Sequence, residues 1–186
     1  LTFLESGNEP TAFAIANKVE KYNEDLFVEE PSTVGEDSVD EAAVRRLALA
    51  LEKRTLANQE ARTKYADQPK RFMDSEIELQ ETLEEMQILA ANPSLYHILA
   101  SQTRPVSLLL GLLSHENTDI ALAVLDLLYE LFEPRGLAEA GREATDPLID
   151  AMVLQGHLGQ LMAHNLSRMD ETSKDEAEGV HKTLGI

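Results

Sequence analysis

Apolar residues recur at helical spacing along most of the chain, and the pattern is sharpest from residue 38 onward. In the first clear segment they are Val44, Leu47 and Leu51. These positions share one helical face, since residues three and four apart are neighbours on a helix. Ser38 and Glu41 have the spacing of a capping box, in which each side chain bonds the other residue's backbone N–H. We therefore predict a long helix that begins at Ser38 and ends before Pro69.

A second long amphipathic helix is predicted before Pro93, because proline interrupts a helix. Its apolar positions are Phe72, Ile77, Leu79, Leu83, Met86 and Ala90. Two adjacent long helices indicate a hairpin, so we predict that residues 38–92 form a helical hairpin cap. Residues 1–37 are predicted to be an acidic extension made of a helix and a linker, because residues 29–37 contain few apolar side chains.

From residue 93 onward the predicted helices are shorter. Residues 94–101, 105–114 and 117–132 each have a helical pattern, and Asn117 can cap the third of them. Asp146-Pro147 is predicted to open the next helix, with a capping residue followed by proline at the first helical position. The residues between these helices, 133–145, contain glycine and several acids and are predicted to form a surface insertion.

The order of these helices repeats along the chain. Ala121, Val124 and Leu128 correspond to Ala177, Val180 and Leu184, each 56 positions later. A unit of one short and two longer helices cannot bury its apolar faces alone, so such units stack into a solenoid. We predict an all-α fold: an armadillo- or HEAT-like right-handed α-solenoid whose repeats occupy residues 93–186 and are truncated at the C-terminus.

The charge of the chain is strongly negative. Against 34 Asp and Glu stand 16 Lys and Arg, which gives a formal net charge of −18. Phosphate backbones and anionic lipids are repelled on average, so a basic partner is favoured. Residues 45–73 are the exception, with eight bases and three acids. The candidates for a basic surface in this block are Arg45, Arg46, Lys53 and Arg54.

Two interpretations of the basic block remain open. It either pairs with the acidic residues of the same chain, or it forms a separate contact surface. In the second case the block docks RNA or an acidic protein, and the solenoid serves as a spacer. RNA-binding surfaces usually offer aromatic rings for stacking, and the block contains only Tyr65 and Phe72. We therefore do not expect direct nucleic-acid binding.

Several runs of residues resemble the family of beta-catenin-like protein 1. They are Glu52-Lys53-Arg54, Asn58-Gln59-Glu60, residues 69–76, residues 95–99, residues 109–113 with 115–119, Asp170-Glu171, and residues 176–181. The likeness extends from about residue 38 to residue 186. It implies an armadillo-type solenoid found in the nucleus with the Prp-nineteen-associated complex of the spliceosome.

The same resemblance implies the partners. The family binds basic nuclear-localisation segments of splicing proteins, including the Myb-domain subunit of that complex, so we expect a non-catalytic interaction scaffold. The acidic composition agrees, because a negatively charged concave surface steers Lys- and Arg-rich peptides toward it.

The carboxylates expected to meet a basic peptide lie on the third helix of each repeat. If Val124 and Leu128 face the core, the groove-facing positions are near Ala123, Leu127 and Glu130. The candidate partner-binding residues are Asp119, Asp126, Glu130 and Asp175. For each of them the alternative is a carboxylate that is merely solvated. Importin-type proteins use Trp on this helix, and the chain has no Trp, so we do not expect that mode of recognition.

Residue combinations that would support catalysis or a metal site are missing from the sequence. It contains no cysteine, and its histidines are too scattered for a ligand set. Glu178 and His181 have the spacing of half a di-iron site, but no second pair accompanies them. We expect no enzyme activity, no cofactor and no metal.

Membrane association is not expected either, because no apolar run reaches the ~20 residues that span a bilayer. The apolar residues near Ile186 predict an exposed last layer of the stack, which the rest of a longer protein or a second copy of the chain would cover. Homo-oligomerisation therefore remains an alternative.

Overall fold

The computed structural model describes residues 39–186, so the predictions for residues 1–37 and for the cap at Ser38 lie outside the described residues. The α-helices of the described part are α2 (Glu41–Lys64), α3 (Met73–Met86), α4 (Tyr96–Ala100), α5 (Thr103–Gly111), α6 (Thr118–Leu131), α7 (Pro134–Ala140), α8 (Arg142–Ile149), α9 (Leu158–Leu166) and α10 (Lys174–Gly185). Short 3-10 turns at Pro69–Arg71, Gln87–Leu89, Pro93–Leu95 and Leu112–Ser114, and a π-helical turn at Asp150–Gln155, join some of them. Residues 39–186 contain no β-strand, and the predicted all-α class is confirmed.

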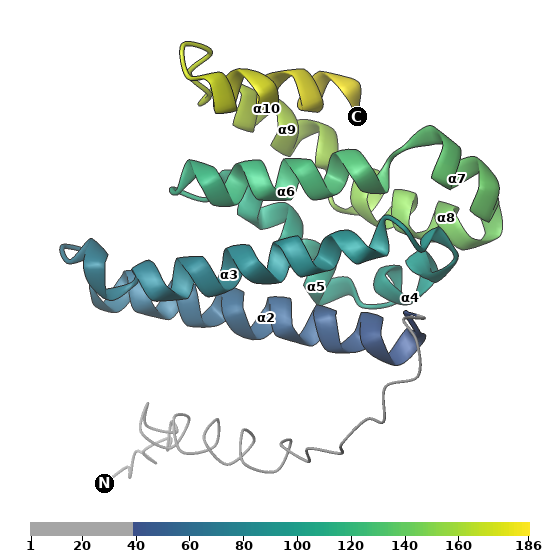
Figure 1. Ribbon diagram of the computed structural model, residues 1–186, viewed down its shortest axis with the longest axis horizontal. Coiled ribbons are helices and arrows are strands. Elements are labelled where there is room, and N and C mark those ends of the chain that lie inside the picture. Colours follow the sequence, from purple (N-terminus) through teal and green to yellow (C-terminus); the bar gives the residue numbers. More distant parts are fainter. Residues whose placement is uncertain (1–38) are drawn as a thin grey trace, which may run out of the picture. The chain divides into compact units, whose positions relative to one another are not determined.

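The helices stack in layers of two (Figure 1). α2 and α3 form the first layer, α5 and α6 the second, and α9 and α10 the third. α3, α6 and α10 follow one another on one side of the stack, while α2, α5 and α9 follow one another on the other side. The short helices α4 and α8 contact each other in the same way. This is the α-solenoid that the repeated helix order predicts.

The register between α6 and α10 matches the 56-residue repeat of the sequence. Lys182 on α10 contacts Asp126 on α6, 56 positions earlier. One turn before Lys182, Gly179 faces Leu122, and a Cβ added there would lie 2.4 Å from Leu122 Cδ2. The glycine therefore permits the close approach of the two helices.

α6 is the most deeply buried helix of the stack. Its buried residues are Ile120, Ala121, Val124, Leu125, Leu127, Leu128 and Leu131. The side-chain oxygen of Asn117 accepts the backbone N–H of Asp119 at 3.0 Å and caps the helix, as the sequence predicts. The prediction that Leu127 faces a groove is wrong, because Leu127 is fully buried. α3 covers α6 on one side and α10 covers it on the other, so its apolar face is wider than that of a surface helix.

The predicted start of the first long helix differs from the observed one. α2 begins at Glu41, and its N-cap is Asp40, whose Oδ1 accepts the backbone N–H of Ala43 at 2.7 Å. Asp is as good a capping residue as Ser, and it lies directly before the helix, so a cap at Ser38 is not needed.

The predicted helix start at Asp146-Pro147 is also wrong. Pro147 lies inside α8, which begins four residues before Asp146, after Gly141 with a φ of 79°. The missing N–H of proline leaves the carbonyl of Glu143 without a helical donor, and Glu143 is exposed to water. The segment 133–145, predicted to be a surface insertion, contains α7 and the first turn of α8, and all of its residues except Thr145 are exposed or partly exposed.

A polar cluster at one edge of the stack joins the first layer to the second. Asn58 on α2 is 1% exposed, and its amide donates to Ser75 Oγ on α3 at 3.0 Å. Its side-chain oxygen lies 3.0 Å from His115 Nε2, in the loop before α6. The backbone N–H of Asn117 donates to His115 Nδ1 at 3.0 Å, so the neutral ring carries its proton on Nε2 and donates to Asn58. Burial lowers the pKa of His115 below its usual 6.5.

Acid is expected to loosen this cluster through His115. Below pH 6.5 the unfolded chain binds a proton that the folded chain resists, so the free energy of unfolding falls as the pH drops from 6.5 toward the lowered folded pKa. This contribution is fully present above pH 6.5. The melting temperature between pH 7.5 and pH 5.5 measures it. His115→Gln keeps an N–H donor for Asn58 and is expected to show a smaller decrease over this range than the unchanged chain. Equal decreases would assign the pH dependence to other groups.

Candidate functional site

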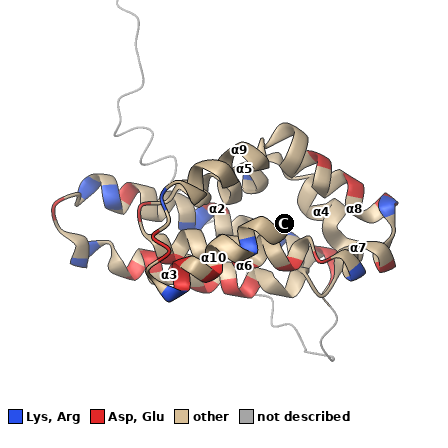
Figure 2. Ribbon diagram, turned by 90° about the horizontal axis from the view of Figure 1, so that it is seen from above, with Lys and Arg blue, Asp and Glu red and all other residues tan. Residues whose placement is uncertain are grey.

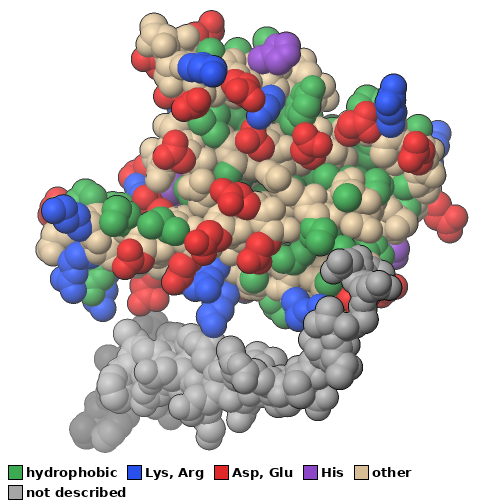
Figure 3. Space-filling view, viewed as in Figure 1, with side chains coloured by type: hydrophobic (Ala, Val, Ile, Leu, Met, Phe, Trp, Pro, Cys, Tyr) green, Lys and Arg blue, Asp and Glu red, His purple; other side chains and the backbone are tan. Residues whose placement is uncertain are grey.

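The exposed side of α6 carries a line of acidic residues. Asp126 and Glu130 follow Asp119 by 7 and 11 positions, and these spacings return to the same face of a helix. Asp119 and Glu130 are exposed, and the Asp126 side chain is 41% exposed. Figure 3 shows Asp and Glu side chains spread over the face formed by α3, α6 and α10. The structure therefore brings the three predicted residues of α6 onto one surface.

Asp175 extends this line onto the next layer. It lies in the first turn of α10, and the 56-residue register places it at the level of Asp119. It is exposed, and no ion pair joins it to another residue of the described range 39–186. The two carboxylates thus lie at the same end of two parallel, adjacent helices.

Asp126 is not available as a free carboxylate. Its Oδ1 accepts from Lys182 Nζ at 2.8 Å, and the same ammonium group lies 2.9 Å from Glu178 Oε1. The hydrogen bond to Asp126 raises the pKa of Lys182, so the lysine stays charged. The partner-binding role of Asp126 stays a prediction, but the residue also ties α6 to α10, and Lys182 offsets its charge inside the chain.

A hollow of about 400 Å³ lies beside this ion pair. It is formed by the segment that follows α3, the C-terminal half of α6, the N-cap residue of α7 (Pro134–Ala140) and one residue of α10. Its lining residues are Gln87, Ala90, Ala91, Asp126, Tyr129, Glu130, Glu133 and Lys182. Glu130 has no hydrogen bond or ion pair to any side chain within residues 39–186. Glu133 Oε2 accepts the backbone N–H of Gly136 at 2.7 Å. We call this feature the α6 hollow.

The carboxylates of the α6 hollow also act on a neighbouring residue. Tyr96, on α4, is 2% exposed. Burial, together with the smaller effects of the Glu130 and Glu133 charges, raises the pKa of Tyr96 to about 12. The contribution of the two glutamates has the sign expected near a surface that favours a positive charge.

Tyr129 and Glu133, which also line the α6 hollow, were not among the site residues predicted from the sequence. Tyr129 is 39% exposed and lies between the acidic line and α10. Glu133 follows Glu130 by three positions but comes after the end of α6. The spacing of three positions from Glu130 could have indicated that Glu133 lies on the same side of the stack. Pro134 argued against this, because a helix usually ends before a proline. For Tyr129 the sequence offers no signal, because an aromatic residue in an apolar run is ordinarily part of the core.

The predicted basic surface on α2 divides into two parts. Arg45 Nη2 lies 3.2 Å from Glu41 Oε2, and Arg54 forms an ion pair with Glu78 on α3. Arg46 and Lys53 have no ion pair with any residue of the described range. Figure 2 shows further Lys and Arg residues at the looped end of the α2–α3 hairpin. Internal pairing therefore accounts for two of the four predicted residues only.

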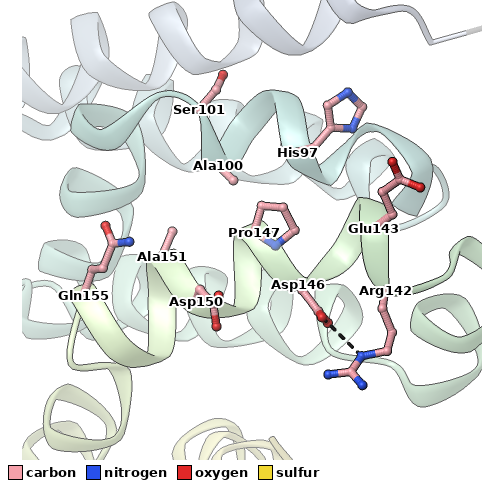
Figure 4. Close-up of a pocket in the computed structure, with 10 residues that line it drawn as sticks. All are labelled: His97, Ala100, Ser101, Arg142, Glu143, Asp146, Pro147, Asp150, Ala151 and Gln155. Carbon is pink, nitrogen blue, oxygen red and sulfur yellow. Dashed lines mark hydrogen bonds and ion pairs between the residues drawn. The ribbon is translucent and has the colours of Figure 1, made fainter.

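Another hollow, of about 670 Å³, lies between α4 and α8, and its side chains do not form a catalytic arrangement (Figure 4). His97 Nδ1 lies 2.9 Å from the carbonyl of Ser94, and Ser101 Oγ donates to the carbonyl of Ile98 at 2.7 Å. Each side chain is thus engaged by its own helix, and the two do not form a nucleophile–base pair. At the same hollow, Arg142 Nε lies 3.2 Å from Asp146 Oδ2, so the charges of these two side chains offset each other.

Among residues 39–186 no three His, Asp or Glu side chains gather in a way that could hold a metal ion. None of the helices in this range is both long and apolar enough to cross a membrane.

The chain was then compared with known proteins. Residues 21–186 match the family described as catenin-beta-like, Arm-motif containing, nuclear. The chain belongs to this catenin-beta-like family. The helix order, the 56-residue register and the acidic face of α6 described above are therefore features of a catenin-beta-like solenoid. The resemblance inferred from the sequence is confirmed.

Individual relatives support the same assignment. Beta-catenin-like protein 1 of Homo sapiens is 46% identical over 148 residues, which are 80% of this chain and 26% of the human protein. The mouse protein, of Mus musculus, is 45% identical over the same length. Beta-catenin-like protein 1 homolog of Schizosaccharomyces pombe is 31% identical over 169 residues, 91% of this chain and 29% of the yeast protein. The chain thus spans less than a third of the length of these relatives.

Proposed function

We propose that this catenin-beta-like chain is part of a non-catalytic interaction scaffold of the pre-mRNA splicing machinery in the nucleus. Its partners are basic nuclear-localisation segments of splicing proteins, including the Myb-domain subunit of the Prp-nineteen-associated complex. The family description supports the nuclear location and the Arm-type class. The role in splicing rests on the similarity to beta-catenin-like protein 1.

The observation that carries this proposal is the α6 hollow. Glu130 and Glu133 both place negative charge there, and within the described residues no cation neutralises Glu130. The hollow is wide enough to admit one Lys or Arg side chain of an extended peptide. The exposed ring of Tyr129 lines the same space and can contact the aliphatic stem or the cation of that side chain. Tyr129 thus offers an aromatic contact for a basic side chain, which Trp provides in importin-type recognition.

Lys182 sets one limit of the basic-peptide site. Its ammonium group is held between Asp126 and Glu178, so a second cation is repelled from that edge of the hollow. A bound peptide therefore places this cation near Glu130, and its other cations meet Asp119 and Asp175 on the far side of Lys182. Several weak charge contacts along such a line determine register and association rate more than affinity.

Binding of a basic peptide is expected to depend strongly on salt. The contacts are exposed, and the Debye length falls from about 10 Å at 0.1 M salt to about 3 Å at 1 M. For a fluorescein-labelled peptide of about 12 residues with five Lys or Arg, we expect the affinity to fall at least tenfold between 0.05 and 0.5 M NaCl in fluorescence anisotropy.

A peptide of the same length with Gln in place of Lys and Arg is the control. It should bind far more weakly at low salt. An affinity of the basic peptide that is independent of salt, or equal binding of both peptides, would contradict recognition by charge.

A further inference from the structure

Three unpaired cations lie in one line along α2. Lys53 and Lys64 follow Arg46 by 7 and 18 positions, and both spacings return to the same face of a helix. All three are exposed, and none has an ion pair with another residue of the range 39–186. With a rise of 1.5 Å per residue the line is about 27 Å long. We call it the α2 ridge. Glu60 interrupts it before Lys64, so its most positive part is Arg46 and Lys53.

The paired arginines of α2 lie off this line. Arg45 is bound to Glu41, Arg54 to Glu78, and Arg62 to Glu76 and Glu116. Arg45 and Arg54 lie on opposite sides of the α2 ridge, and Arg62 lies on the side of the helix that faces the stack. The chain thus neutralises the flanking cations and leaves the central ones without partners among its described carboxylates.

Apolar surface flanks the α2 ridge on both sides. On one flank Leu49 is 60% exposed and Leu56 is 41% exposed. On the other flank an apolar groove of about 490 Å³ runs between α2 and α3. Its lining residues are Val39, Ala43, Arg46, Leu47, Ala50, Glu85 and Ile88. The face opposite to the ridge packs on the rest of the stack through Val44, Ala48, Leu51, Thr55 and Asn58. Leucines and a groove beside unpaired cations are typical of a surface that a partner covers.

The composition of this surface favours a protein segment over RNA. Single-stranded RNA stacks its bases on open aromatic faces, and the flanks of the α2 ridge are aliphatic. Tyr65 is near the end of α2, but its ring is covered by the guanidinium of Arg71, 3.8 Å from the ring centre. An amphipathic helix fits both features, because it can place carboxylates and apolar side chains on one face.

We propose that the α2 ridge docks an acidic amphipathic helix of a partner protein. Carboxylates seven positions apart on the partner meet Arg46 and Lys53. Its apolar side chains enter the α2–α3 groove and cover Leu49 and Leu56. This site is separate from the α6 hollow and takes a partner of opposite charge, so the two proposals stand or fall independently.

The test uses a labelled synthetic helix of about 18 residues, with Glu at positions i and i+7 and Leu at i+3 and i+4, in fluorescence anisotropy with the purified chain. We expect Arg46→Glu with Lys53→Glu to weaken binding at least tenfold.

The matched control is Arg135→Glu with Lys174→Glu, which changes the net charge equally. Both control residues are exposed and have no ion pair within the described range. We expect this control to stay within twofold of the unchanged chain. Circular dichroism shows whether each variant retains its helices.

A second pair of variants tests the apolar contribution. Leu49→Ser with Leu56→Ser leaves the charges intact, and we expect it to weaken binding of the same peptide at least threefold. The proposal is overturned if the labelled helix does not bind, if a peptide of the same composition in scrambled order binds equally well, or if the control variant loses as much affinity. Binding of a single-stranded RNA of about 12 nucleotides in place of the helix would also overturn it.

Discussion

Glu130→Lys combined with Glu133→Gln is expected to weaken binding of a basic peptide about tenfold or more, with little loss of stability. The first change reverses the one carboxylate of the α6 hollow that has no partner among residues 39–186. The second removes the charge of Glu133 but keeps an oxygen that can accept the N–H of Gly136 and cap α7. Two exposed charge contacts contribute about 0.2–1 kcal/mol each, and the new lysine adds repulsion of similar size. A total of about 1.4–2 kcal/mol corresponds to a factor of roughly 10–30 in Kd.

The matched control for this variant is Glu139→Lys with Glu171→Gln. Both residues are exposed, they lie outside the lining of the hollow, and the net charge changes by the same amount. Isothermal titration calorimetry with the basic peptide should give a Kd within about twofold of the unchanged chain. If the control loses affinity to the same extent, the peptide responds to the overall charge of the chain and the α6 hollow is not its site.

Leu127→Ala is expected to lower the free energy of unfolding by about 2–5 kcal/mol. Leu127 is fully buried on α6, between the helices of the first and third layers, and its removal leaves a cavity that packed helices fill only in part. The value comes from urea denaturation followed by circular dichroism. This variant distinguishes a buried Leu127 from a groove-facing one, because truncation of a groove-facing leucine would lower the free energy of unfolding by less than about 0.5 kcal/mol.

Leu184→Ala is the control for the loss of a leucine side chain as such. Leu184 is 74% exposed on α10, so its truncation should change the free energy of unfolding by no more than about 0.5 kcal/mol. Similar values for the two variants would mean that Leu127 is not in the core.

The helices were largely predictable because their limits depend on local chemistry. Asn117 and the apolar spacing that follows it defined α6, and Pro69 and Pro93 limited the two long helices. The errors occurred where two local signals compete. α2 begins at Glu41, after the cap Asp40, and Pro147 is accommodated within α8 because the carbonyl that it leaves without a donor belongs to an exposed turn.

The sequence predicted the negative charge of the candidate site, but not which of its carboxylates are free to bind a partner. Helical periodicity correctly placed Asp119, Asp126 and Glu130 on one face. It could not reveal that Lys182, 56 positions away, neutralises Asp126. The same limit applies to the basic residues of α2, where carboxylates of α3 pair with some of them and leave Arg46 and Lys53 unpaired.

The sequence alone determined the all-α class, the stacked repeats, the 56-residue register and the negative charge of the α6 face, because each of these follows from spacing and composition within short segments. Tertiary structure decided which carboxylates and cations remain unpaired, that Leu127 is core, and that Tyr129 and Glu133 border a hollow. These features depend on contacts between layers that are distant in the sequence. A side chain is buried or neutralised by whatever the neighbouring layer presents to it, and residue spacing within one helix does not contain that information.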